Sequence, residues 1–342
     1  MNIQNIIDAI KATVESHKLE NEGEYARYLW QNEKNDRLMG VNPYGCADAI
    51  NILYTINEFP RDLEVRKKHV DVLQSLQDSE TGLFTEDTHH PIHTTAHCTA
   101  ALELFDALPL YKFKALNKYK TIDGLYDLLE GLDWIIDPWP QSHQGAGIYA
   151  ALKLNEETTE EWEKAYFDWF WENADPEFGF WKKGLIDEHP DKFFRNMAGG
   201  FHYMFNHQYA KMPLRYPEKI IDKCLELYYN TKMGKTQGLC FPEILTFGNK
   251  VGFLEIDWIY SISRSLKQCG HRHKECIETI RDFACNYIEW LNSLDYKTHD
   301  SFNDLHMLFG TTCALAEIQA TLPGEFTTDK PLRLVLDRRP FI

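Results

Sequence analysis

A short pattern recurs along the chain at intervals close to 50 residues, and this spacing constrains the fold more than any other feature. The segments HTTAHCTAALEL from His93 and HQGAGIYAALKL from His143 share histidine at the first place, alanine at the fourth and Ala-Leu at the ninth and tenth. Four further segments fit the same template, and they begin at Tyr44, Arg195, Asp257 and His306. A period of this length is typical of two short helices with their connections. The sequence therefore predicts six helical hairpins.

The template segments differ in character from the segments between them. The templates are rich in small residues and nearly uncharged, whereas the intervening segments carry charge on one face and apolar residues on the other. Because an inner layer of helices touches protein on almost every side, we expect the templates inside and the amphipathic helices outside. The alternation typical of strands is not apparent. These patterns predict an all-α fold, in which residues 1–342 form a single (α/α)6 toroid domain. Residues 323–342 are expected to be an extended tail that packs across the outside or one face of the ring.

Composition and charge narrow the choice of partners. The formal net charge of −16 opposes binding to phosphate backbones and anionic lipids, so neither nucleic acid nor a membrane is expected as a partner. No apolar run approaches the ~20 residues that a membrane span needs, and the N-terminus lacks the features of a secretory signal. The eight cysteines show no CxxC spacing, which favours reduced thiols. These features predict a cytoplasmic protein with a small-molecule substrate.

The candidate site follows from the first residue of each template. Equivalent places in a repeat lie at equivalent places in space, so these six residues should form one circle at the N-terminal mouth of the inner helices. Helix caps favour Ser, Thr, Asp or Asn, but the residues here carry imidazole, guanidinium and phenol groups. The exposed N–H groups of the helix starts would also favour an anionic or hydroxyl-rich ligand. Neighbouring places and loops add Asp48, His97, Gln144, Asn196, His202, Glu255, Trp258, Trp139 and Asp304, with His89, His90 and Ser142 nearby.

Glycine-aromatic turns precede several of the expected inner helices. They are Gly82-Leu83-Phe84, Gly179-Phe180-Trp181 and Gly238-Leu239-Cys240-Phe241, and Gln77-Asp78 and Asp175-Pro176 lie ahead of the first two. With six hairpins, these turns resemble the terpenoid cyclase and protein prenyltransferase toroid superfamily. The resemblance implies a ring of inner and outer helices, a shape that six-hairpin glycosidases, uronate lyases and sugar epimerases also use. The shape alone therefore does not choose a chemistry.

We expect the site to act on a carbohydrate or uronate-like molecule by acid/base chemistry, as a hydrolase, lyase or epimerase. A hydrolase would use two carboxyls from Asp48, Glu255 and Asp257, and a sugar ring would stack on Trp139 or Trp258. An elimination or epimerisation would use histidine or tyrosine as base and acid, with Arg195 and Asn196 neutralising a carboxylate. The predicted catalytic residues are His93, His143, Asp257, His306, Asp48 and Glu255. The predicted substrate-binding residues are Tyr44, His97, Trp139, Gln144, Arg195, Asn196, His202, Trp258 and Asp304.

Three alternatives remain open. A divalent metal could be held by His93, His143 and His306, with Asp257 as a further ligand. A prenyltransferase or terpene cyclase would match the resemblance, but an aspartate-rich acid motif is not found and Ile259 stands where that family's zinc-binding cysteine would be. Finally, the ring could bind a ligand without turnover.

Overall fold

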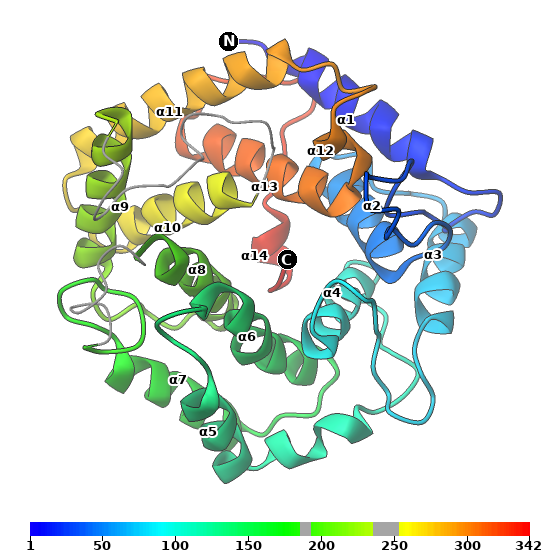
Figure 1. Ribbon diagram of the computed structural model, residues 1–342, viewed down its shortest axis with the longest axis horizontal. Coiled ribbons are helices and arrows are strands. Elements are labelled where there is room, and N and C mark those ends of the chain that lie inside the picture. The colour runs from blue at the N-terminus through cyan, green and yellow to red at the C-terminus, as the bar shows by residue number, and fades with distance from the viewer. Residues whose placement is uncertain (185–192, 235–252) are drawn as a thin grey trace.

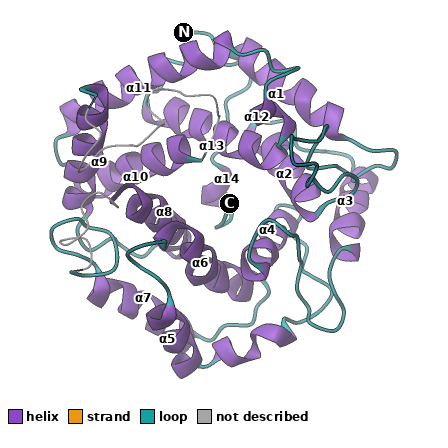
Figure 2. Ribbon diagram, viewed as in Figure 1, coloured by secondary structure: helices purple, strands orange, loops and turns teal. Residues whose placement is uncertain are grey.

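The computed structural model describes residues 1–184, 193–234 and 253–342. Within these ranges the chain forms helices joined by loops, with isolated bridges but no β-strand (Figure 2). The helices are α1 (Gln4–His17), α2 (Pro43–Thr55), α3 (Leu63–Ser75), α4 (Pro91–Glu103), η1 (Lys114–Lys120), α5 (Ile122–Gly131), α6 (Pro138–Leu154), α7 (Glu160–Asn173), α8 (Phe193–Ala210), α9 (Pro217–Lys232), α10 (Leu254–Cys269), α11 (His273–Ser293), α12 (Asp300–Asn303), α13 (Leu305–Thr321) and α14 (Val335–Arg338). The prediction of an all-α fold is confirmed for the described residues.

The template segments form a layer of helices around the centre of the molecule. Figure 1 shows α2, α4, α6, α8, α10 and α13 on the inside, with α1, α3, α5, α7, α9 and α11 outside them. Each inner helix contacts the next, and α13 returns to α2. The inner helices are buried along almost their whole length, which explains why their sequences carry few charges.

The starts of three inner helices share one local design. Proline is the first residue of α2, α4 and α6, where its fixed φ suits a helix and its missing N–H costs nothing. In α2 the side chain of Asn42 accepts from the backbone of Tyr44 and Gly45, and in α4 His90 accepts from Ile92. These starts place the polar first residues of the templates close to the N-terminal helix ends.

Two of the glycine-aromatic turns have the same hydrogen bonds, which supports the internal repeat. The backbone N–H of Asp78 donates to Leu83 and that of Gly82 to Asp78; Asp175 N–H donates to Phe180 and Gly179 N–H to Asp175. The turn at Gly238 lies outside the described residues.

Replacing Gly82 by alanine should destabilise the protein by about 2 kcal/mol or more. Gly82 has φ +81°, and an added Cβ would lie 2.2 Å from the carbonyl oxygen of Lys112, so both strain and collision oppose the substitution. Urea unfolding measures the change. Gly131→Ala, at a glycine with no atoms near its absent Cβ, is the control. Equal unfolding midpoints for the two variants would contradict the expectation.

The tail ends in the middle of the molecule, where Figure 1 shows α14 and the C-terminus. Before it reaches the centre, the tail passes the C-terminal ends of inner helices, where Arg333 N–H donates to the carbonyl of Thr55 and Arg338 pairs with Glu103. Helix α14 contacts α8 and α2, and the ring of Phe341 lies 4.8 Å from that of His93. Phe341 and Ile342 are buried because they fill apolar space between the inner helices.

Two sequence predictions concern thiols and membranes. Seven cysteines are free in the described ranges, and Cys240 lies outside them. No helix among the described residues is long and apolar enough to cross a bilayer.

Candidate functional site

Six histidines and one tyrosine meet at the centre of the inner helices; we call them, together with Asp48, the imidazole cluster. The ring of His93 lies 4.3 Å from that of His143 and 4.8 Å from that of His89, and the rings of His143 and His202 are 5.3 Å apart. The ring of Tyr44 lies 4.6 Å from that of His306. The members of the cluster are Tyr44, Asp48, His89, His93, His97, His143, His202 and His306.

Asp48 joins two of these histidines. His97 Nε2 donates to Oδ1 of Asp48 at 2.7 Å, and His306 Nδ1 lies 3.2 Å from both of its oxygens. Asp48 follows Tyr44 by four residues on α2, and His97 follows His93 by four on α4, so each pair shares a helix face. The arrangement gives a carboxylate with two imidazole donors in the centre of the protein.

Hydrogen bonds also involve the ring nitrogens of other histidines in the cluster, and in His202 they determine which nitrogen carries the proton. His202 Nδ1 lies 3.0 Å from the hydroxyl of Ser142, which donates its own hydrogen to the carbonyl of Trp139. Since that hydroxyl must therefore accept, His202 carries its proton on Nδ1. The phenol of Tyr44 is hydrogen-bonded to Nδ1 of His93.

Burial controls the charge of the cluster. It lowers the pKa of His202 to about 3 and that of His306 to about 4, and it holds the pKa of His93 and His143 well below the usual range. Burial also opposes ionisation of Asp48, but His306 and His97 hold its pKa below the usual value. Near neutral pH His93, His143, His202 and His306 are thus neutral imidazoles, in one cluster with the carboxylate of Asp48.

Buried histidines outside the cluster make stability depend on pH. Burial lowers the pKa of both His69 and His207 to about 4, whereas an unfolded histidine titrates near pH 6.5. Below pH ~6.5 the unfolded chain binds protons that the folded chain does not, so stability falls as the pH decreases toward 4, by on the order of 3 kcal/mol for each residue. His207→Phe should reduce this dependence in urea unfolding measured at several pH values. An unchanged slope would contradict the assignment.

The three histidines predicted as metal ligands do not form one group. Among the described residues, ligand atoms within 4.8 Å of one another occur in three sets: His93, His143 and His202; His89, His93 and His306; and Asp48, His97 and His306. His143 and His306 are therefore divided between sets, because α6 packs directly on α4 whereas α13 packs on α2 and α10. Asp257 belongs to none of these sets.

The first residues of two templates do not reach the cluster. Arg195 is partly exposed, with its guanidinium 3.7 Å from Asp137 and hydrogen-bonded to the carbonyl of Ile136. His202 instead represents α8, since it follows Arg195 by seven residues on the same helix face. Asn196 is buried, and its side-chain amide donates to the carbonyl of Trp181.

Asp257 and Glu255 are both buried in the first turn of α10. Burial, together with the charge of Glu255, raises the pKa of Asp257 well above its usual value. Because Asp257 lies outside the cluster, it does not supply the second carboxylate expected for a hydrolase.

Three predicted substrate-binding residues also have other contacts. Trp258 donates to the carbonyl of Cys224 and stacks on Tyr228, so it packs toward α9. Asp304 accepts from the backbone of His306 and pairs with Arg27. Trp139 packs partly buried against the core at the start of α6.

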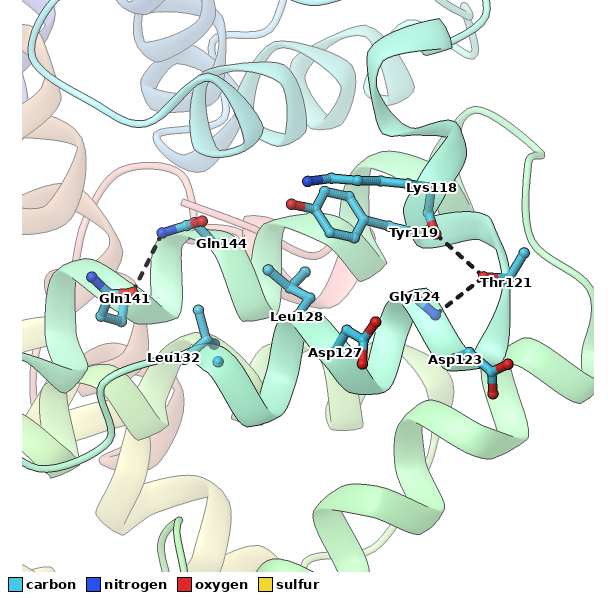
Figure 3. Close-up of a pocket in the computed structure, with 11 residues that line it drawn as sticks. Lys118, Tyr119, Thr121, Asp123, Gly124, Asp127, Leu128, Leu132, Gln141 and Gln144 are labelled. Atoms are coloured by element: carbon cyan, nitrogen blue, oxygen red, sulfur yellow. Dashed lines mark hydrogen bonds between the residues drawn. The ribbon is translucent and has the colours of Figure 1, made fainter.

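Gln144 lines a different cavity, of about 530 Å³, between α6, α5 and η1. Figure 3 shows Gln141 and Gln144 on the α6 side of this cavity, with Leu128 of α5 and Leu132, which follows α5, close by. The side chain of Gln144 therefore faces the outer layer of helices.

Two residues near the cluster come from the tail, which carries no repeat pattern. The ring of Phe341 contacts the rings of His93 and His202, at 4.8 and 6.2 Å. Arg339 is fully buried, and none of its side-chain nitrogens has a hydrogen-bond partner among the described residues. Burial lowers the pKa of Arg339 to about 10, so it remains protonated at neutral pH. A buried charge without a partner was detectable only once the path of the tail was known.

Comparison with known proteins gives no relative: no family model, no curated protein and no solved structure matches this chain.

Proposed function

We propose that this chain is a cytoplasmic (α/α)6 toroid enzyme that performs acid/base chemistry at the imidazole cluster on an anionic, hydroxyl-rich small molecule, such as a uronate-containing carbohydrate. The closed series of contacts between inner helices, with one outer helix for each, supports the toroid. The observation that carries the function is Asp48 between His97 and His306, since a carboxylate that accepts from an imidazole orients it as a base.

The hydrogen bonds suggest a role for each group. His306 donates from Nδ1 to Asp48, which leaves Nε2 to take a proton from the substrate, and Asp48 stabilises the imidazolium that forms. The high pKa of Tyr44, raised by burial, keeps its phenol protonated and able to donate. At neutral pH the imidazole of His306 is therefore unprotonated and able to accept a proton, while the phenol of Tyr44 can donate one.

The charges favour elimination or epimerisation over hydrolysis. A two-carboxyl hydrolase needs a second acid close to the bond, but among the described residues Asp48 is the carboxylate held between two cluster histidines, and Glu86 is engaged by Arg27 and Thr88. In an elimination, His306 would take the hydrogen next to the substrate carboxylate, the C–H electron pair would form a double bond, and the β C–O bond would break as Tyr44 protonates the leaving oxygen. In an epimerisation the proton would return to the opposite face.

Arg339 supports an anionic substrate. Its guanidinium lies 5.4 Å above the ring of Phe309, and no described carboxylate pairs with it. A substrate carboxylate would satisfy this buried charge. In this proposal Arg339 takes the role first expected of Arg195.

Substituting Arg339 by methionine should separate stability from binding. Removing an unpaired buried charge should leave stability unchanged or raise it, by up to about 4 kcal/mol. The KM for a carboxylate substrate should rise about tenfold to hundredfold, as expected for a lost charged hydrogen bond. Urea unfolding and steady-state kinetics measure the two effects. Arg338→Met is the control, because Arg338 pairs with Glu103 and Asp106 away from the cluster. A large loss of stability in Arg339→Met alone would count against an unpaired charge.

The proposal is tested by proton NMR of oligosaccharides incubated with the protein in D₂O. Both elimination and epimerisation remove the hydrogen next to the uronate carboxylate, so its signal should disappear with uronate oligosaccharides and persist with neutral ones. Binding without loss of that signal would instead indicate a ligand-binding ring without turnover. A prenyl-transfer or cyclisation chemistry is less consistent with this cluster, because its basic imidazoles would quench a carbocation.

A further inference from the structure

Three neighbouring inner helices each contribute one histidine to a compact set. His93 on α4, His143 on α6 and His202 on α8 have ligand atoms within 4.8 Å of one another, and their ring centroids lie 4.3 to 6.3 Å apart. Because α4 contacts α6 and α6 contacts α8, the set is held by the rigid wall of the inner layer. We infer that His93, His143 and His202 bind a divalent transition-metal ion of the zinc class.

The proton positions suit this ligand set. The hydroxyl of Ser142 fixes the proton of His202 on Nδ1. Nε2 of His202 therefore keeps a free lone pair. The phenol oxygen of Tyr44 can accept from Nδ1 of His93 in the same way. Ligand histidines in metal sites usually donate their other N–H to such a partner.

The surroundings also suit a metal that takes part in a reaction. Phe341 closes the set on the side of the tail, while His143 is only partly buried. Three imidazole ligands leave a fourth position for water or substrate, as in catalytic zinc sites. Nitrogen ligands without a thiolate favour zinc and its neighbours over calcium or magnesium.

The other two sets are less suitable. In the set of Asp48, His97 and His306, both rings already donate a proton to the carboxylate, so a metal would have to displace these hydrogen bonds. The set that contains His89 depends on a residue of the loop before α4, whose Nδ1 is bonded to Thr88.

The inference deepens the proposed function and rests on it for the nature of the substrate. A metal at His93, His143 and His202 would bind an anionic or hydroxyl oxygen of the substrate, next to the pair formed by Asp48 and His306. The chemistry that the ion supplies is stabilisation of negative charge on that oxygen.

The test is titration of the metal-free protein with Co²⁺, followed by visible absorption, and elemental analysis after dialysis against Zn²⁺. The wild type should bind one equivalent and give the intense bands of low-coordinate cobalt. His202→Ala should weaken binding at least 100-fold, and Ser142→Ala, which removes only the partner of the His202 Nδ1 proton, about tenfold to hundredfold. His271→Ala is the matched control, because His271 is partly exposed and pairs with Asp222.

Each outcome decides the inference. Circular dichroism melts establish whether His202→Ala is folded, and if it is not, Ser142→Ala decides. Stoichiometric binding that is lost in these variants supports the site. Absence of stoichiometric binding, or loss in His89→Ala but not in His202→Ala, overturns it. Metal binding is measured without substrate, so the two proposals can fail separately. Proton exchange on uronates by a protein that binds no metal would overturn only the metal site. Metal binding without proton exchange would overturn only the proposed function.

Discussion

Asp48→Asn should lower kcat about 10⁴-fold with little change in fold. An asparagine amide can accept from one of the two imidazoles, but its NH₂ group faces the other donor, so either His97 or His306 must change its tautomer. The substitution also removes the charge that would stabilise an imidazolium, and a loss of this size is known where a carboxylate orients a catalytic histidine in this way. Proton exchange on a uronate oligosaccharide measures the effect.

A surface carboxylate gives the control for this experiment. Asp71 on α3 is exposed and pairs only with Lys67 at the surface, so Asp71→Asn should keep full activity. Asp48→Asn should also reduce the free energy of unfolding by about 1–3 kcal/mol, because one buried N–H loses its acceptor. Full activity in Asp48→Asn would remove the imidazole pair from the reaction.

Phe341→Ala should destabilise the protein by about 3–5 kcal/mol. The ring of Phe341 is fully buried and contacts the rings of His93, His202 and Phe205, so truncation leaves a cavity between inner helices. Water entering that cavity would reduce the desolvation that lowers the pKa of His93 and His202. Urea unfolding measures the stability, and histidine NMR signals report the pKa values.

Leu110→Ala is the control for the tail substitution, since Leu110 is an exposed apolar residue. It should change stability by no more than about 0.5 kcal/mol. If Phe341→Ala also unfolds at the wild-type urea concentration, the tail does not pack between the inner helices as described.

The repeat pattern predicted much of the cluster because equivalent places in a repeat share a position in space. Tyr44, His93, His143 and His306 were expected together from this argument, and the structure brings them together. Asp48 and His97 could be added because four residues make about one helical turn.

The same argument placed Arg195 in the circle, although the structure has it near the surface. The template fixes which face of α8 points inward, but not how far α8 is shifted along its axis, and the shift brings His202 to the cluster. The template also does not fix the direction in which a side chain points around the helix axis. It did not reveal that the indole of Trp258 points toward α9.

The contribution of the tail could not be predicted from local sequence. Arg339 and Phe341 follow no helical period, and their burial depends on space that exists only after the inner helices have assembled. Phe341 looks like an ordinary apolar residue and Arg339 like a surface charge when the sequence is taken alone. Long-range packing, which no short window encodes, decides both positions.

The most direct test of the account is long-range ¹H–¹⁵N NMR of protein labelled at histidine, because both proposals depend on neutral imidazoles with defined protons. We expect His202 and His306 to carry their protons on Nδ1 and His97 on Nε2, with no protonation of His202 or His306 between pH 8 and about pH 5. Assignments come from single substitutions of each histidine. Titration of His202 or His306 near pH 6.5, or exchange of either ring between tautomers, would contradict a buried and hydrogen-bonded imidazole cluster.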